Sequence, residues 1–355
     1  MTERSLIASR PANPPEGIYS QLSGRRKRLL WLGLVSLFLT GLIDISTGSS
    51  PLSFGELLQT LLAGPEGTAL NTTIVWQLRL PVTLTCFVVG ASLGLAGGLM
   101  QTLLANPLAS PYTLGISAAA GFGAGFALLT GFSVAGIHWL GIPVAAFVTA
   151  GLASLGIWQI GRLQHMNARS LILAGIVVLF FFQALQSLVQ YLAAPEVLQQ
   201  IVFWLFGSLL KANWTSFWVS GLIFICVFLA VIPRVWKLTA LSVGDDKAQA
   251  LGIKTSRLRL EIFLLCSLLT AGAVSFVGTI GFVGLVAPHL ARMLVGEDQR
   301  FYLPLSALMG ALILTAASLV SKLIVPGTII PIGIVTSLVG VPFLLYFLIR
   351  EGGRP

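Results

Sequence analysis

The sequence predicts an all-α, polytopic membrane protein with about ten membrane-spanning helices. Of its 355 residues, 56% are apolar and only 9% are charged, and the mean hydropathy is +0.92. A soluble domain carries about 25% charged residues. Long apolar stretches and an uneven distribution of Lys and Arg along the chain support the same fold class.

Ten apolar stretches have about the length that a helix needs to cross a bilayer, roughly 20 residues. They lack the two-residue alternation of a membrane β-barrel, so we expect helices. The eighth stretch is short for a full crossing. The predicted spans are 29–48, 80–105, 114–132, 142–160, 170–191, 214–232, 260–278, 281–295, 303–324 and 332–349.

The polar segment before the first span ends in four basic residues, Arg25 to Arg28. A cleaved signal peptide has a shorter apolar core and a small-residue cleavage site. The stretch 29–48 is long enough to stay in the membrane. We therefore expect a disordered cytoplasmic tail over residues 1–28 and a single transmembrane domain over 29–350.

The net charge of +9 reflects membrane topology rather than nucleic-acid binding. With ten spans and a cytoplasmic N-terminus, 18 of the 21 Lys and Arg residues fall on the cytoplasmic side, and only Arg79, Lys211 and Lys322 fall outside. Short cytoplasmic loops are enriched in Lys and Arg. We expect a multi-pass protein of the cell (inner) membrane, with both termini cytoplasmic and no nucleic-acid partner.

No catalytic or metal-binding pattern is visible. Cys86, Cys226 and Cys266 fall within predicted spans without metal-ligand spacing, and the three histidines are scattered. The sequence has neither a nucleophile–base arrangement nor a Gly-rich phosphate-binding loop with Lys and Ser or Thr. We expect no metal site, no enzyme activity and no nucleotide site in this chain.

Small residues recur at helical spacing in the second span, where Gly90, Gly94 and Gly98 are four residues apart. This spacing lets helices approach closely in lipid. It fits ordinary helix packing, and it also fits a central helix that lines a path. Gln101 favours the path, because an uncompensated amide in hydrocarbon is costly.

Two polar segments interrupt the apolar pattern. The insert 234–260 has short amphipathic pieces broken by Gly244 and Gly252, which predicts two short helices with a glycine hinge. These helices either rest on lipid or dock a cytoplasmic partner. The loop "LLANPLASPYTLG" (103–115) has two prolines that disfavour helix, and irregular backbone at membrane depth is tolerated where it lines a cavity. It is either a plain turn or a gate.

Seven motifs then stand in the order and spacing of a known family. From about residue 30 to 350, the chain resembles the permease subunits of type II ABC importers, which move iron chelates, haem and cobalamin. The motifs are "LRLP" (78–81), "NPLASP" (106–111) followed by "LG", "LILAG" (171–175), "GDDKAQALG" (244–252), "FVGLVAPHLAR" (282–292), "LPLSALMGA" (303–311) and "PIGIVTSLVGVPFLLYFL" (331–348).

The resemblance implies a ten-helix permease that pairs with a second permease subunit, as a homodimer or a heterodimer, around a central path. It also implies two copies of a cytoplasmic ATPase, which bind ATP and Mg, and a substrate-binding protein outside. No cofactor is expected in this chain.

Site residues follow from the same resemblance, by motif. Coupling helices at about 238–254 would seat in the ATPase through Gly244, Asp245, Ala248, Leu251 and Gly252, with Asp245 where many relatives have Glu. The gate and translocation path would use Gln101, Asn106, Leu108, Asn167 and Ala168. Docking of the binding protein would use Arg79 and Lys322.

The chain departs from the family pattern at three positions of the outer side. Val82 stands where relatives usually have a second basic residue, Ser318 where an acidic residue is common, and Ile329 near a common Glu. The docking surface of this subunit is therefore expected to be weakened. A different permease partner that carries the missing charges would explain this, and a homodimer stays open.

The sequence thus predicts the permease subunit of an ATP-driven importer, with a ferric siderophore as cargo and haem or cobalamin as alternatives. A secondary active transporter would need ionisable residues inside the spans. The only acidic residues near the spans are Asp44 and Glu261, and both are close to helix ends. A membrane enzyme would need a catalytic cluster, which the sequence lacks.

Overall fold

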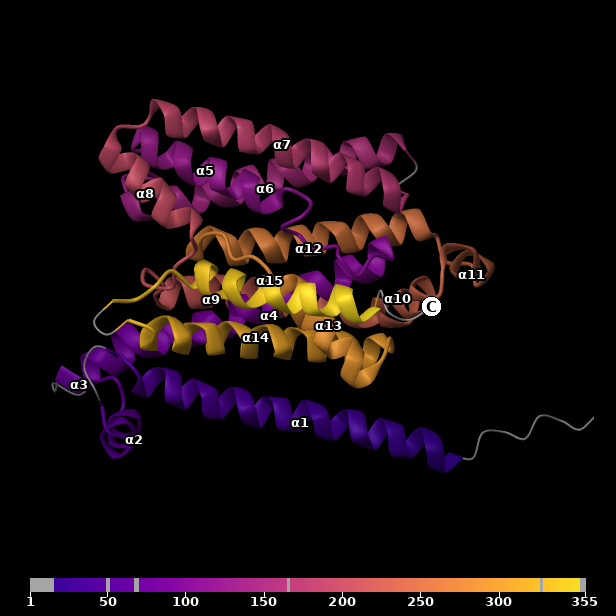
Figure 1. Cartoon of the computed structure of the whole chain (residues 1–355), viewed down its shortest axis with the longest axis horizontal. Coiled ribbons are helices and arrows are strands. Elements are labelled where there is room, and N and C mark those ends of the chain that lie inside the picture. The colour runs from indigo at the N-terminus through magenta and orange to yellow at the C-terminus, as the bar shows by residue number, and fades with distance from the viewer. Residues whose placement is uncertain (1–15, 49–51, 67–69, 165–166, 326–327, 352–355) are drawn as a thin grey trace, which may run out of the picture.

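Helices make up every named element of the computed structural model, which describes residues 16–48, 52–66, 70–164, 167–325 and 328–351 (Figure 1). In Figure 1, α1 lies along one edge of the bundle and α7 along the opposite edge, with α4 between them. The α-helices are α1 (Glu16–Ser46), α2 (Phe54–Ala63), α3 (Leu70–Thr73), α4 (Leu80–Leu104), α5 (Ile116–Thr130), α6 (His138–Leu163), α7 (Ala168–Leu192), α8 (Pro195–Leu205), α9 (Trp214–Val231), α10 (Val235–Ser242), α11 (Asp245–Ala250), α12 (Thr255–Val277), α13 (Val283–Val295), α14 (Gln299–Leu323) and α15 (Ile332–Glu351).

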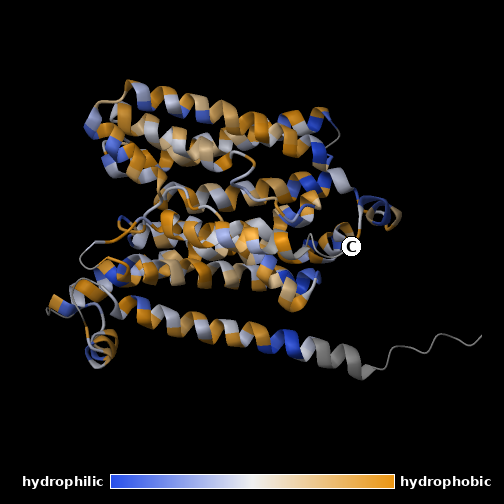
Figure 2. Cartoon of the chain, in the orientation of Figure 1, coloured by the Kyte–Doolittle hydropathy of each residue, from blue (hydrophilic) through white to orange (hydrophobic). Residues whose placement is uncertain are grey.

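Seven helical segments among the described residues are long and apolar enough to cross a membrane. Three shorter apolar helices accompany them, in α5, α13 and α15. Hydrophobic residues cover most of the length of the bundle, and hydrophilic residues gather towards the ends of the helices (Figure 2). The predicted all-α, polytopic fold class is confirmed, including the short eighth apolar helix.

The N-terminal tail differs from its prediction. Residues 16–28, expected to be disordered, belong to α1, which begins at Glu16 and continues without a break into the first span. Arg26 holds this extension in place, since its guanidinium lies 3.1 Å from the Asp298 carboxylate and over the Phe301 ring. Residues 1–15 lie outside the described residues.

The beginning of the second span also differs. The sequence predicts this span from residue 80, but the apolar helical segment begins at Leu70 and reaches Leu80 through α3 and a π-helical segment, Ile74–Arg79. The short helices α2 and α8 were not predicted, because each is too short to register as a span. Their start signals were nevertheless present: a capping box of Ser53 with Glu56 before α2, and Pro195 at the first position of α8.

The central helix of the bundle is α4, which contacts α9, α12, α13 and α14. Three of its four glycines, Gly90, Gly94 and Gly97, lie against backbone atoms of neighbouring helices, and Gly98 lies against side chains of α14. A Cβ on Gly90 would clash with the Gly310 carbonyl of α14, and a Cβ on Gly97 would clash with the Gly284 carbonyl of α13. The glycines therefore allow close packing of helices, which is the first of the two interpretations offered by the sequence.

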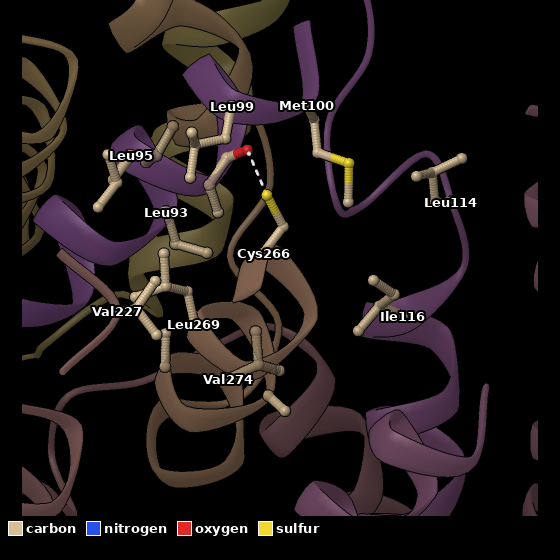
Figure 3. Close-up of a cluster of buried hydrophobic side chains, with 14 of the residues drawn as sticks. Leu93, Leu95, Leu99, Met100, Leu114, Ile116, Val227, Cys266, Leu269 and Val274 are labelled. Atoms are coloured by element: carbon tan, nitrogen blue, oxygen red, sulfur yellow. Dashed lines mark hydrogen bonds between the residues drawn. The ribbon is translucent and has the colours of Figure 1, made fainter. Parts of the chain in front are cut away.

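Around these contacts lies a tightly packed apolar core. Figure 3 shows Leu93 of α4 beside Val227 of α9 and Leu269 of α12, and Met100 of α4 on the side of Leu114 and Ile116. The Cys266 thiol donates a weak hydrogen bond of 3.7 Å to the carbonyl oxygen of Ala96 (Figure 3). This residue is a buried packing element, as is Cys86.

We predict that Gly97→Ala lowers the unfolding temperature of the detergent-solubilised protein, because the added methyl group meets the Gly284 carbonyl. Overpacking of this kind costs about 1–3 kcal/mol. Gly151→Ala in α6 is the matched control, since no atom of a neighbouring element lies within 4 Å of the place that its Cβ would occupy. There, alanine should leave stability equal or raise it by up to about 1 kcal/mol. Equal unfolding temperatures for both variants would contradict the packing role of Gly97.

Candidate coupling and gating site

The polar insert between α9 and α12 forms two short helices, α10 and α11, at the end of the bundle where α1 begins (Figure 1). We call this end the basic end, after Arg25 to Arg28 in α1. Gly244 separates the two helices with φ +117°, and Gly252 follows α11 with φ +76°. Side chains disfavour these backbone conformations, so glycine is required at both turns. The predicted pair of short helices with a glycine hinge is present.

One side of the α11 segment packs against the bundle, and the other side is exposed. Ala248 is completely buried against the bundle, whereas Leu251, just after the helix, is 72% exposed. Asp245, at the first helical position, accepts hydrogen bonds from Arg259 at the start of α12. The five residues predicted for coupling thus lie in one compact turn-helix-turn unit that presents an apolar side chain to its surroundings.

Beside this unit lies a groove of about 710 Å³, lined by the α9–α10 junction, residues 251–254 and the start of α12. Its four cations are Arg234, Lys237, Lys254 and Arg257. Its one carboxylate, Glu261, pairs with Arg234 at 2.9 Å and with Arg257 at 3.0 Å. The groove therefore keeps a positive balance, and Leu251 lines it.

Both predicted gate elements contribute to one hollow. A space of about 410 Å³ is lined by residues 104–107, at the end of α4 and just after it, and by Ala168, Arg169, Ile172 and Leu173 of α7. Asn106 and Ala168 line it together, although they are far apart in sequence. Leu108 and Asn167 are adjacent to the lining residues rather than part of the lining, and Leu108 is 47% exposed.

An asparagine shapes the backbone on each side of this hollow. The Asn106 side-chain oxygen Oδ1 accepts from the Leu108 N–H at 2.9 Å, which forms a tight turn around Pro107. The Asn167 side-chain oxygen Oδ1 accepts from the Ser170 N–H at 2.8 Å and caps the N-terminus of α7. The loop that the sequence describes as a plain turn or a gate is thus an ordered turn that borders a cavity.

Gln101 lies elsewhere. Its side chain is 1% exposed, donates to the Leu285 carbonyl at 3.3 Å and accepts from the Tyr302 hydroxyl at 3.2 Å. The amide is therefore compensated by α13 and α14 within the chain. In this conformation Gln101 joins helices and does not line an open surface.

Arg259 stands out in the sequence only as one of the cytoplasmic cations, yet it is a central contact of the basic end. The residue is 5% exposed. Its guanidinium makes two hydrogen bonds to the Asp245 carboxylate, at 2.8 and 2.6 Å, and a third, of 3.2 Å, to the Leu103 carbonyl at the end of α4. The sequence feature that could have singled out Arg259 is its position in "RLRL". It is two residues after Arg257, so the two arginines lie on different faces of α12.

At the opposite end of the bundle, the two predicted docking cations have partners within the chain. The Lys322 ammonium lies 2.7 Å from the carboxylate of Asp44, which is completely buried. Thr83 and Ser318 also donate to this carboxylate, at 2.6 and 2.8 Å. Arg79 donates to the Ile45 and Ser46 carbonyls at the end of α1, at 2.8 and 2.9 Å. Their role in docking stays a prediction.

Comparison with known proteins identifies the chain. The model of the FecCD transport family matches residues 36–350, which is nearly the whole described bundle. The chain belongs to the FecCD transport family. It is therefore a permease of the ABC-transporter class, which the sequence favoured over a secondary active transporter.

Individual relatives cover almost all of this FecCD permease. The hemin transport system permease protein HmuU of Yersinia pestis is 34% identical over 93% of this chain and 98% of its own length. The molybdate import system permease protein MolB of Haemophilus influenzae is 35% identical over 89% of this chain and 94% of its own length. A solved chain, described as from a metal-chelate type ABC transporter in an inward-facing conformation, has a TM-score of 0.81 and 31% identity over 92% of this chain and 99% of its own.

The departures from the FecCD pattern converge in space. Val82, Ser318 and Ile329 all line one cavity of about 340 Å³ at the end opposite the basic end, together with Arg79 and Lys322. Ser318, one of the expected departures, donates to Asp44. In this chain, α1 thus supplies the carboxylate that neutralises Lys322.

We predict that Asp44→Asn destabilises the solubilised permease by about 3 kcal/mol, because it leaves the mostly buried Lys322 ammonium without its carboxylate. The double variant Asp44→Asn/Lys322→Met should recover much of this loss, since it removes both charges. Unfolding temperatures of the two variants and the wild type provide the measurement. If the double variant were less stable than the single one, the ion pair would not be the reason for the burial of Asp44.

Proposed function

We propose that this chain is the permease subunit of an ATP-driven importer, and that it forms the translocation path for a ferric chelate delivered by a substrate-binding protein. The observation that carries the proposal is the arrangement of the basic end. There, the exposed helix α11 is joined through Arg259 to the end of α4, beside the hollow that Asn106 and Ala168 share. The residues proposed to contact the ATPase and the residues proposed to form the gate are thus connected by hydrogen bonds within this chain.

The cytoplasmic partner would be an ATPase, present in two copies for a pair of permease subunits. Leu251 offers an exposed apolar anchor, and the neighbouring groove offers a positive surface. A partner with an apolar pocket and acidic rim would complement both features, because buried apolar anchors supply most binding energy and rim charges steer association. In this proposal the basic end, and with it both termini, faces the cytoplasm.

On the outer side, the binding protein would dock over the cavity around Arg79 and Lys322. Most of the side chains that line this cavity are apolar. Both cations are already hydrogen-bonded within the chain. Docking in this subunit would therefore depend on shape and apolar contact more than on charge, which agrees with a weakened docking surface and with a second, different permease subunit.

The proposed cargo is a ferric siderophore. A solved structural neighbour is described as a metal-chelate type transporter, while the related HmuU and MolB are named for hemin and molybdate. A ferric chelate is bulky and polar and suits a path of small or weakly polar side chains. Haem, cobalamin and molybdate are the competing cargoes.

Replacement of Leu251 by Asp is expected to abolish co-purification with the ATPase, because a carboxylate cannot enter an apolar pocket without a large desolvation penalty. Leu62→Asp is the matched control. Leu62 is 80% exposed in α2, at the other end of the bundle, so its variant should retain the ATPase. Equal retention by both variants would place the ATPase contact elsewhere.

Cargo is decided by uptake into vesicles that contain the whole complex and ATP. We expect radiolabelled ferric hydroxamate to accumulate, and haem, cobalamin and molybdate to accumulate much less. Omission of the ATPase should abolish uptake even when an ion gradient is imposed. Accumulation of molybdate or haem without any ferric chelate would overturn the cargo proposal and leave the importer proposal intact.

A further inference from the structure

The contacts of Arg259 join three parts of the chain that the sequence holds far apart. Its side chain starts from the first turns of α12, reaches Asp245 of α11, and also reaches Leu103 of α4, which is 156 residues earlier. The three hydrogen bonds measure 2.8, 2.6 and 3.2 Å. A single buried guanidinium therefore bridges the helix proposed to meet the ATPase and the helix that ends at the gate hollow.

The chemistry of each contact explains why arginine stands here. The planar guanidinium meets the Asp245 carboxylate with two parallel hydrogen bonds, which fixes orientation as well as distance. The Leu103 carbonyl belongs to the last turn of α4, where carbonyls lack helical partners and attract a cation. Lysine carries the same charge but donates from one nitrogen, so it cannot keep the planar bidentate contact with Asp245 while a third nitrogen bonds to Leu103.

The gate loop follows directly from this contact. Leu103 is one residue before the end of α4, and Ala105 and Asn106 then form the turn that lines the hollow. The backbone N–H groups of Ala105 and Asn106 both bond to the Gln101 carbonyl, so the last turn of α4 and the start of the loop form one unit. A force on the Leu103 carbonyl acts on this unit.

The unit containing α11 is bounded by a glycine turn on each side. Glycines with positive φ lie before and after it, at Gly244 and Gly252. Its side-chain attachments to the rest of the bundle include the packing of Ala248, a 3.4 Å hydrogen bond from Gln249 to Thr255, and the ion pair of Asp245. Of these, the ion pair is the one that leads on to α4.

We propose that Arg259 is the positioning residue that transmits displacement of α11 to the gate loop. The inference rests on the proposed function, since it takes α11 as the contact of the ATPase. When α11 shifts, the Asp245 carboxylate draws the guanidinium with it, and the hydrogen bond to Leu103 shifts the last turn of α4. Without the bidentate contact, α11 moves and the gate does not follow.

The test follows the two ends of this link separately in the complex with the ATPase, reconstituted in vesicles. Spin labels are attached through Lys247→Cys on α11 or Leu108→Cys in the gate loop. Cys226 is exposed and is replaced by Ser in every chain, while Cys86 and Cys266 are buried and are kept. The measurement is the change in label mobility when ATP is added.

In the otherwise wild-type chain, both labels should respond to ATP. With Arg259→Lys, the Lys247 label should still respond, and the response at Leu108 should fall about tenfold, as expected for loss of a charged hydrogen bond. Arg257→Lys is the matched control. Arg257 is two residues earlier, has an exposed side chain and forms its ion pair with Glu261 of the same helix, so both labels should respond fully.

Variants of Asp245 provide a second route if Arg259→Lys folds poorly. Asp245→Asn should lose the Leu108 response, and Asp245→Glu should restore it, because only the latter keeps a bidentate carboxylate. A full Leu108 response in Arg259→Lys, or in Asp245→Asn, would overturn the link while the importer proposal stands. An absent response at Lys247 in the wild type, with no ATPase retained, would overturn the importer proposal and the link together.

Discussion

Close backbone contact between α4 and its neighbours is the constraint on which the rest of the structure depends. Lipid tails are as apolar as leucine side chains, so helices in a membrane gain little by burying apolar surface against one another. Association then requires close approach, and Gly90 and Gly97 provide it by meeting the Gly310 and Gly284 carbonyls directly. The end of this central helix also borders the hollow that Asn106 and Ala168 share, where we propose the gate.

Polar side chains connect the bundle where glycine contacts do not. Gln101, Asp44 and Arg259 are each at most 5% exposed, and each bonds to groups on two other helices or segments. A buried polar group without partners is strongly destabilising, so such residues require a specific arrangement of helices. They therefore specify which helix ends lie together, and they do so at both ends of the bundle.

The two ends of the bundle use charge differently. At the basic end, Lys237 and Lys254 line an open groove with a positive balance, while Asp298 is held by Arg300 and Arg26. Hydrogen bonds from Arg300 and the nearby Arg26 charge lower the pKa of the Asp298 carboxyl, so this anchor of α1 is ionised at neutral pH. At the other end, Asp44, Arg79 and Lys322 bond to groups within the chain, and the cavity that the two cations line is largely apolar.

The sequence by itself determined the features that are local: apolar stretches of spanning length, glycines that break the polar insert, prolines that end α4, and motifs that name the family. Each depends on residues close together in the chain, so periodicity and composition reveal it. Tertiary structure alone decided which distant polar groups meet. Arg259 contacts Leu103, and Asp44 contacts Lys322, because the packing arrangement of the helices brings these residues together. The helical extension of α1, which begins at Glu16, likewise contains Arg26, and Arg26 contacts Asp298, 272 residues later in the sequence. No local pattern encodes such partners, since they are fixed by backbone contacts elsewhere in the bundle.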